Sequence, residues 1–116
     1  MAALAVAALG LQQSVPAAPT ASPAGQLVNT YCVTCHSQKL KSGNLILERV
    51  DADHVANAAV VWEKVIVKLR SRAMPPPGLP RPENATYDAV ATWLESEIDH
   101  AAKPARTQAV RPRCIA

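Results

Sequence analysis

The sequence contains few aromatic side chains: two tryptophans, two tyrosines and no phenylalanine. Aromatic residues make up only 3% of the 116 positions, so the large side chains that usually fill a small core are scarce. A chain of this length can build one small core, which excludes a multidomain enzyme. We therefore expect something other than aromatic side chains to fill part of the interior.

The sequence also lacks the pattern of a half-buried β-strand. No segment alternates β-branched or aromatic residues with polar ones. Ten prolines disfavour an extended sheet as well, because proline cannot donate a ladder hydrogen bond. We predict an all-α fold with few strands or none.

Acidic residues are missing from both ends of the chain. Residues 25–102 hold eight Lys/Arg and nine Asp/Glu, a net charge of −1, so the overall charge of +3 comes from the four basic residues that follow. The folded part is nearly neutral, which disfavours nucleic-acid binding. We predict a basic, disordered tail over residues 104–116, in which the isolated Cys114 has no function.

No apolar run is long enough to span a bilayer comfortably. Residues 1–11 are apolar and Ala-rich, and a stretch rich in Pro, Ala, Ser and Thr follows up to residue 24. This is the length and order of a signal peptide, although no Lys or Arg precedes the apolar run. We predict that residues 1–24 are a signal peptide or a flexible N-terminal arm, that the protein is exported to the bacterial periplasm, and that it has no integral membrane span.

Three helices are predicted over the remaining residues. The first covers residues 25–37, the second runs from Asp51 or Asp53 to residue 72, and the third runs from residue 82 or 83 to 102, where Pro104 closes it. Apolar residues recur at steps of three and four along each of them. The predicted core positions are Leu27, Val28, Tyr31 and Cys35 in the first helix, Val55, Ala59, Trp62, Ile66 and Leu69 in the second, and Tyr87, Val90, Ala91, Leu94, Ile98 and Ala101 in the third.

The motif Cys32-Val33-Thr34-Cys35-His36 carries the clearest chemical signal. Two cysteines three residues apart, followed directly by histidine, are the attachment signature of a c-type haem. Both sulfurs can form thioethers with the two vinyl groups of one porphyrin edge, and the histidine is then delivered beneath the iron. We predict one covalent haem c, attached through Cys32 and Cys35, with His36 as the proximal iron ligand.

Other interpretations of the cysteine pair remain open at this point. A redox disulfide expects a βαβ context that the sequence does not show. A zinc site needs four ligands, and no second pair of cysteines or histidines completes one. A structural disulfide would close only a very small loop.

Met74 is the predicted distal iron ligand. It lies where the second helix is forced to stop, in the sequence Met74-Pro75-Pro76-Pro77-Gly78, and the prolines stiffen the loop around it. Its thioether is an established type of haem ligand. The alternatives are His54, His100 or an open sixth position that reacts with peroxide or binds a gas.

From about residue 24 to residue 102, the chain resembles a small class I cytochrome c. The resemblance rests on a helix leading into Cys-x-x-Cys-His, a middle helix, a Met-Pro-Pro loop and a last helix with Trp93-Leu94. More narrowly, residues 31–37 and 72–76 resemble the cytochrome c modules at the front of large exported planctomycete and acidobacterial proteins. The resemblance implies a domain over residues 25–103, with three main helices around one haem and the first helix crossing the last.

With both axial positions filled, the chemistry left to such a haem is transfer of one electron. We therefore expect an electron carrier that is not an enzyme by itself, or the haem module of a larger oxidoreductase, with redox proteins of unknown identity as partners.

The surroundings of the haem can also be predicted. We expect a backbone carbonyl of residues 42–44 to accept a hydrogen bond from His36. Arg70 and Arg72 could pair with the propionates or lie solvated at a helix end. The candidate haem-packing residues are Leu45, Leu47, Trp62, Ile66, Leu69 and Leu79.

Overall fold

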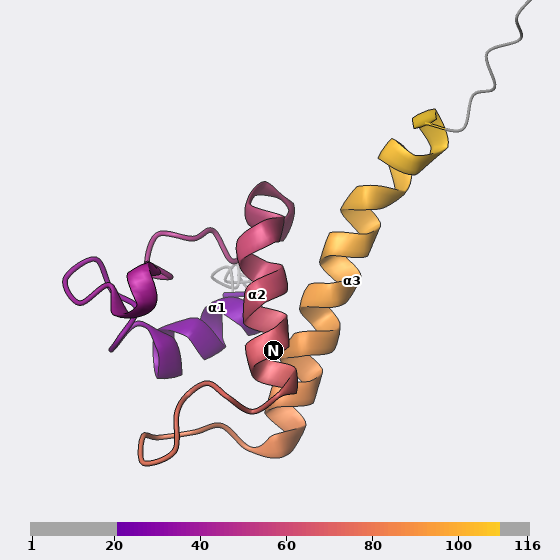
Figure 1. Ribbon diagram of the computed structural model, residues 1–116. Coiled ribbons are helices and arrows are strands. Elements are labelled where there is room, and N and C mark those ends of the chain that lie inside the picture. The colour runs from indigo at the N-terminus through magenta and orange to yellow at the C-terminus, as the bar shows by residue number, and fades with distance from the viewer. Residues whose placement is uncertain (1–20, 110–116) are drawn as a thin grey trace, which may run out of the picture.

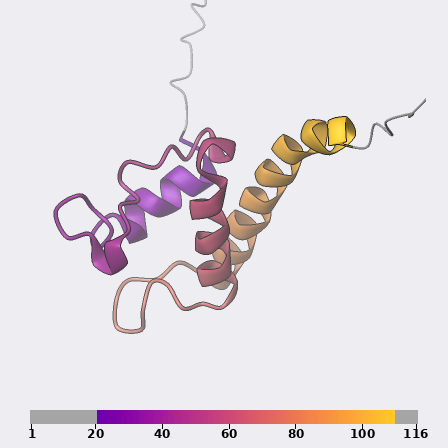
Figure 2. The same ribbon diagram turned by 45° about the horizontal axis from the view of Figure 1, so that its top comes forward.

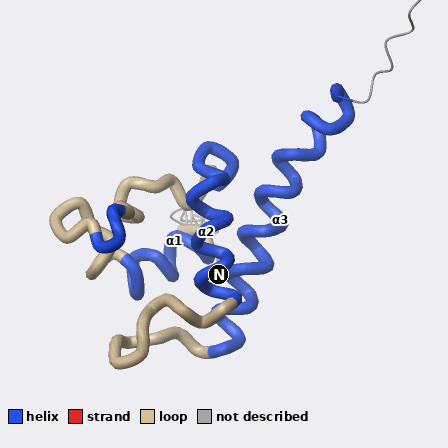
Figure 3. The backbone as a smooth tube through the Cα atoms, viewed as in Figure 1, coloured by secondary structure: helices blue, strands red, loops and turns tan. Residues whose placement is uncertain are grey.

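The computed structural model describes residues 21–109, with side chains over residues 21–103. Residues 1–20 of the predicted signal peptide or arm, residues 110–116 of the basic tail, and with them Cys114, lie outside the described residues. Residues 22–24, the end of the predicted signal peptide or arm, instead cap and begin the first helix. Within residues 21–109 all regular structure is helical and no strand is present, which confirms the all-α prediction for this part of the chain (Figure 3).

Three α-helices form the frame. They are α1 (Pro23–Leu27), α2 (Ala59–Arg70) and α3 (Asn84–Ala109). A π-helical turn (Val28–Cys32) continues α1, and 3-10 turns occur at Ser42–Asn44 and Val55–Ala58. In both ribbon views α2 lies beside α3 (Figures 1 and 2). Helix α1 also contacts α3, near residues 85–90 in its N-terminal half. None of the described helices is both long and apolar enough to cross a membrane.

The first helix begins two residues before the predicted position. The Ser22 hydroxyl accepts a hydrogen bond from the Gly25 N–H at 3.1 Å, which caps the helix. The same hydroxyl donates to the Ala52 carbonyl at 2.8 Å, and Ala24 is fully buried. The helical segment that α1 begins ends at Cys32 and not at residue 37, because the chain enters a tight turn directly after Cys32.

The second helix begins later than predicted. One Asp51 carboxylate oxygen accepts hydrogen bonds from the N–H groups of Asp53 at 2.9 Å and His54 at 3.0 Å. Asp51 thus stabilises a turn, and a 3-10 segment precedes α2. The helix also ends at Arg70, because Arg72 adopts a left-handed conformation with φ 56°.

The third helix continues past Pro104 to Ala109, so the prediction that this proline closes it is wrong. The fixed φ of proline is compatible with a helix, and its cost there is a missing N–H and local crowding. Both ribbon views show the C-terminal part of α3 extending beyond the other helices (Figures 1 and 2).

The core lies where the three helices meet, and Trp62, Tyr87 and Leu94 are its largest fully buried side chains. Six predicted core positions are not fully buried in the structure. Five of them are only half-buried, namely Tyr31, Cys35, Ala59, Ile66 and Ile98. Ala101 is exposed, because the C-terminal part of α3 extends beyond the other helices (Figure 1). The predicted positions that are confirmed as buried are Leu27, Val28, Val55, Trp62, Leu69, Tyr87, Val90, Ala91 and Leu94.

Candidate functional site

The two cysteines of the motif lie on a tight turn at the end of the π-helix. The Cys32 carbonyl accepts hydrogen bonds from the N–H groups of Cys35 at 3.1 Å and His36 at 2.9 Å. This turn brings the three side chains of the motif to one side of the chain. Both thiols are free, and burial raises the pKa of the Cys32 thiol to about 11.

His36 is anchored through its backbone. Its carbonyl accepts a hydrogen bond from the Leu47 N–H at 2.8 Å, which ties the turn to the segment that follows. Its ring atom Nδ1 is buried without a hydrogen-bond partner. The expectation that a carbonyl of residues 42–44 accepts from this ring is therefore not met, and the Ser42 carbonyl instead accepts from the Leu45 N–H.

Met74 reaches the same region from a segment distant in the sequence. It lies in the loop between α2 and α3, and 38% of its surface is exposed. In both ribbon views this loop lies on the same side of the α2–α3 pair as the turn after α1 (Figures 1 and 2). The neighbouring Pro75 is buried, which holds the base of the loop against the molecule.

A cavity of about 240 Å³ brings these side chains together. Both thiols, the imidazole and the thioether line it, although they come from two segments of the chain. None of the lining side chains is a carboxylate, an ammonium or a guanidinium group. The complete lining is Tyr31, Cys32, Cys35, His36, Ser42, Gly43, Met74, Pro75, Pro76 and Leu79.

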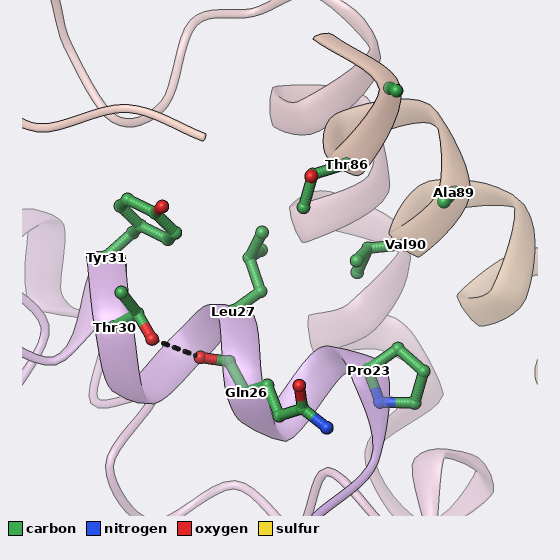
Figure 4. A pocket seen from close by; sticks show the side chains of 9 residues that line it. Pro23, Gln26, Leu27, Thr30, Tyr31, Thr86, Ala89 and Val90 are labelled. Atoms are coloured by element: carbon green, nitrogen blue, oxygen red, sulfur yellow. Dashed lines mark hydrogen bonds between the residues drawn. The ribbon is translucent and has the colours of Figure 1, made fainter. Parts of the chain in front are cut away.

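A larger, open cavity of about 540 Å³ lies between α1 and the start of α3. Leu27 and Val90 approach it from the facing helices, and the Thr30 hydroxyl donates to the Gln26 carbonyl at its edge (Figure 4). Its lining includes no thiol, imidazole or thioether. The chemistry of the molecule therefore belongs to the smaller cavity. Tyr31 lines both cavities and forms part of the wall between them.

The histidines considered as alternative ligands do not line the smaller cavity. His54 is exposed, and its Nδ1 lies 2.8 Å from an Asp51 carboxylate oxygen. His100 is exposed on the part of α3 that extends beyond the other helices.

The candidate packing residues fall into two groups. Leu79 lines the cavity. Leu47, Trp62 and Leu69 belong to the buried core, and Leu45 and Ile66 pack against it. The indole Nε1 of Trp62 is a second buried side-chain atom without a hydrogen-bond partner.

Arg70 and Arg72 are engaged with α3. Arg70 donates to both carboxylate oxygens of Glu95, at 3.0 and 2.7 Å, and Arg72 donates to both oxygens of Asp88 at 2.9 Å. The expectation of a solvated helix end therefore missed a set of ion pairs between α2 and α3. These pairs join residues far apart in the sequence, so no local pattern identifies them.

The donor set of the smaller cavity suits one kind of group. Two thiols can form thioethers, and an imidazole and a thioether can both ligate iron. Cysteines three positions apart on a tight turn present both sulfurs to the same cavity. Among residues 21–103, no cluster of three or more His, Cys, Asp or Glu side chains has an arrangement that could hold a metal ion by itself. The residues present fit a haem, which brings its own iron.

Comparison with known proteins agrees with this donor set. Residues 32–78 match a family model described as Planctomycete cytochrome C. The matched segment begins at the first cysteine of the motif and ends at Gly78, four residues after Met74. No curated protein and no solved structure matches the chain.

Proposed function

We propose that this chain carries one haem c and transfers single electrons, because residues 32–78 match the Planctomycete cytochrome C family model. The supporting observation is that a single cavity is lined by Cys32, Cys35, His36 and Met74. Two of these side chains would attach the haem and the other two would ligate its iron. When bound, a haem iron exchanges one electron by changing between Fe(II) and Fe(III).

The residues of the chain have separate tasks in this proposal. Cys32 and Cys35 would hold the porphyrin edge through thioethers, which would make the attachment permanent. His36 would donate a ring nitrogen from the same turn. Met74 would donate its sulfur from the loop between α2 and α3, and a thioether ligand favours Fe(II) and so raises the potential.

The cavity wall supports this redox role. No charged side chain lines the cavity, and an apolar wall disfavours the additional positive charge of Fe(III). Leu79 lines the cavity from the Met74 loop and would pack against a bound haem. Leu45, Leu47, Trp62, Ile66 and Leu69 form or border the core, and we propose that they complete the apolar surroundings of the haem.

In this proposal the chain is an electron carrier, or the haem module of a larger oxidoreductase. Maturation of c-type haem needs reduced thiols and an export pathway, so we propose that residues 1–24 direct the chain to the periplasm. Its partners are redox proteins that approach the cavity mouth. Leu40, Met74 and Leu79 are large apolar side chains left exposed in this part of the chain.

The test is a reduced pyridine-haemochrome spectrum of protein made with a working periplasmic maturation system. We expect one haem per chain, with the spectrum of two thioether bonds. The matched control is the double variant Cys32→Ser/Cys35→Ser, which should release all its haem on acid extraction. Folded, haem-free protein after full maturation would contradict the proposal.

The oxidised protein provides a second readout. A Met sulfur–iron(III) bond gives a weak long-wavelength absorption, called the Met–iron(III) band below. We expect this band in the unmodified protein. If haem is attached but the band is absent from the start, Met74 does not ligate the iron. A high-spin spectrum would then indicate an open sixth position, and reactions with peroxide or a diatomic gas would become the better account.

A further inference from the structure

The loop that presents Met74 is closed by a hydrogen bond between its two ends. Residues 73–80 lie between Arg72 and Arg81. The Arg81 guanidinium donates to the Arg72 backbone carbonyl at 2.8 Å, across a separation of nine positions. Such a bond from a charged donor is stronger than one between neutral groups. The loop is therefore a closed unit that includes Met74.

Arg72 attaches the first end of this unit to α3. Its guanidinium donates to both oxygens of Asp88 and lies over the ring of Tyr87, with its carbon 4.7 Å from the ring centroid. It also donates to the Leu69 carbonyl at 3.0 Å. The left-handed backbone of Arg72 costs free energy in a non-glycine residue, and these contacts stabilise it.

Arg81 attaches the second end to the same tyrosine. Its Nε donates to the Tyr87 hydroxyl oxygen at 3.2 Å, and its guanidinium carbon lies 5.8 Å from the ring centroid. Tyr87 is only 1% exposed and belongs to the first turns of α3. Both ends of the Met74 loop therefore rest on one buried side chain, and contacts between a cation and an aromatic face add to the hydrogen bonds.

The loop has few other contacts. The Ala73 N–H donates to the Lys68 carbonyl of α2 at 3.0 Å, which fixes the start of the loop. Between residues 73 and 80, only Pro75 is buried. The prolines restrict the local backbone, but they do not determine the direction in which the loop leaves α2. The hydrogen bond of Ala73 fixes only the first residue of the loop, so the course of the loop from Met74 to Arg81 depends mainly on the contacts at Arg72, Arg81 and Tyr87.

We propose that Arg81 and Tyr87 are positioning residues that hold the Met74 thioether at the cavity. This inference rests on the proposed function, because the sulfur needs a fixed place only if it ligates iron. A ligand that is already in place loses little freedom on binding, so it resists displacement by a competing ligand. Loosening the loop should make Met74 easier to replace while the haem remains attached.

In the test, the oxidised, matured protein is titrated with imidazole. Loss of the Met–iron(III) band reports the displacement of Met74 from the iron. Arg81→Gln removes the charged donor from an exposed side chain. We expect the half-saturating imidazole concentration to fall about tenfold, as for loss of a hydrogen bond from a charged group. Tyr87→Phe keeps the ring and removes only the hydroxyl, and should lower this concentration about two- to threefold.

Arg70→Gln is the matched control. Arg70 binds Glu95 and lies 3.5 Å from Asp88, the carboxylate that also binds Arg72. It lies in the last turn of α2, and its hydrogen bonds and ion pairs go to α3 and not to residues 73–80. Its substitution should leave the half-saturating concentration within about twofold of the unmodified protein. Hydrogen exchange provides a second measurement, in which Arg81→Gln should speed exchange of the Leu79 N–H, which donates to the Pro76 carbonyl.

The outcomes separate this inference from the proposed function. An unmodified protein with attached haem and no Met–iron(III) band would overturn the axial assignment, and the positioning role with it. A normal band together with an unchanged imidazole affinity in Arg81→Gln would overturn the positioning role alone. Equal weakening in Arg81→Gln and Arg70→Gln would also overturn it, because the effect would then come from general α2–α3 packing.

Discussion

The two segments that supply the proposed iron ligands are held in different ways. The turn around His36 is built from hydrogen bonds to its own neighbours, since the Cys32 carbonyl accepts from residues three and four positions later. The position of the Met74 loop depends on contacts with Tyr87 and Asp88, which belong to α3. One ligand is thus placed by local chain geometry and the other by tertiary structure.

This difference has a physical consequence. A local turn can form whenever its few residues are ordered, whereas the Met74 loop is in place only when α2 and α3 are packed together. We therefore expect perturbations of the helices to release Met74 before they affect His36. Covalent attachment through Cys32 and Cys35 would keep the haem on the chain in either case.

The largest effect is expected from substitution of Met74, which should remove one iron ligand and leave the attachment on the other side of the cavity intact. Met74→Ala should abolish the Met–iron(III) band while the haem stays attached, because the thioethers belong to the other segment. The reduction potential should fall by on the order of 0.1 V, within the roughly 0.8 V range that axial ligands control. Potentiometry and the oxidised spectrum measure both changes.

The control for this substitution is Leu79→Ala, which changes a side chain of the same loop and the same cavity that has no ligand atom. It should keep the band. A band that survives in Met74→Ala would show that another group is the distal ligand.

The next effect concerns the packing on which the Met74 loop depends. Leu94 is fully buried in α3, so Leu94→Ala should lower the free energy of unfolding by about 2–5 kcal/mol. The Met–iron(III) band should disappear at a lower guanidinium concentration, with the haem still attached. Val60→Ala on the exposed face of α2 should change stability by about 0.5 kcal/mol or less. Equal losses of the Met–iron(III) band in Leu94→Ala and Val60→Ala would contradict the claim that packing of α2 against α3 holds the Met74 loop.

A smaller effect is expected on the His36 side. Gly43 lines the cavity and has φ 62°, and an added Cβ would meet no atom within 4 Å. Gly43→Ala should therefore lower stability by about 1–2 kcal/mol through backbone strain alone. It should leave the imidazole titration of Met74 unchanged, as should Ser42→Ala at the neighbouring position. A lower half-saturating imidazole concentration in Gly43→Ala would mean that the His36 turn and the Met74 loop are coupled.

The smallest effect concerns the exposed pair between α2 and α3. The hydrogen bond from Arg70 lowers the pKa of Glu95 below its usual 4.5. A lowered folded-state pKa contributes stability above pH 4.5, and this contribution is lost as the pH falls through the folded-state value. Glu95→Gln should therefore flatten the acid side of the stability curve slightly. Glu63→Gln, on the exposed face of α2, should leave the curve unchanged.

The sequence was most informative where structure is local. The spacing of Cys32, Cys35 and His36 predicted a common site, and the structure places all three side chains around one cavity. Helical periodicity identified the three helices and most of the buried positions. Met74 could be singled out because the prolines after it stop a helix.

Tertiary and fine backbone features could not be predicted in the same way. The π-helical turn at Val28–Cys32 left the apolar spacing unchanged, so no pattern revealed it. Val55 fits the stripe of α2 although it lies in the 3-10 turn before it. The arginines at the loop ends look like ordinary surface residues until Tyr87 and Asp88 are brought beside them.

We propose that His36 and Met74 ligate the same iron, and NMR of the reduced, matured protein can observe both ligands. Selective labelling of the methionine methyl groups, combined with assignment of the His36 ring, reports on both ligands in one sample. We expect the porphyrin ring current to move the chemical shifts of the Met74 methyl and of the His36 ring protons far outside their normal ranges. A Met74 methyl signal at its ordinary position, in protein with haem attached, would contradict it.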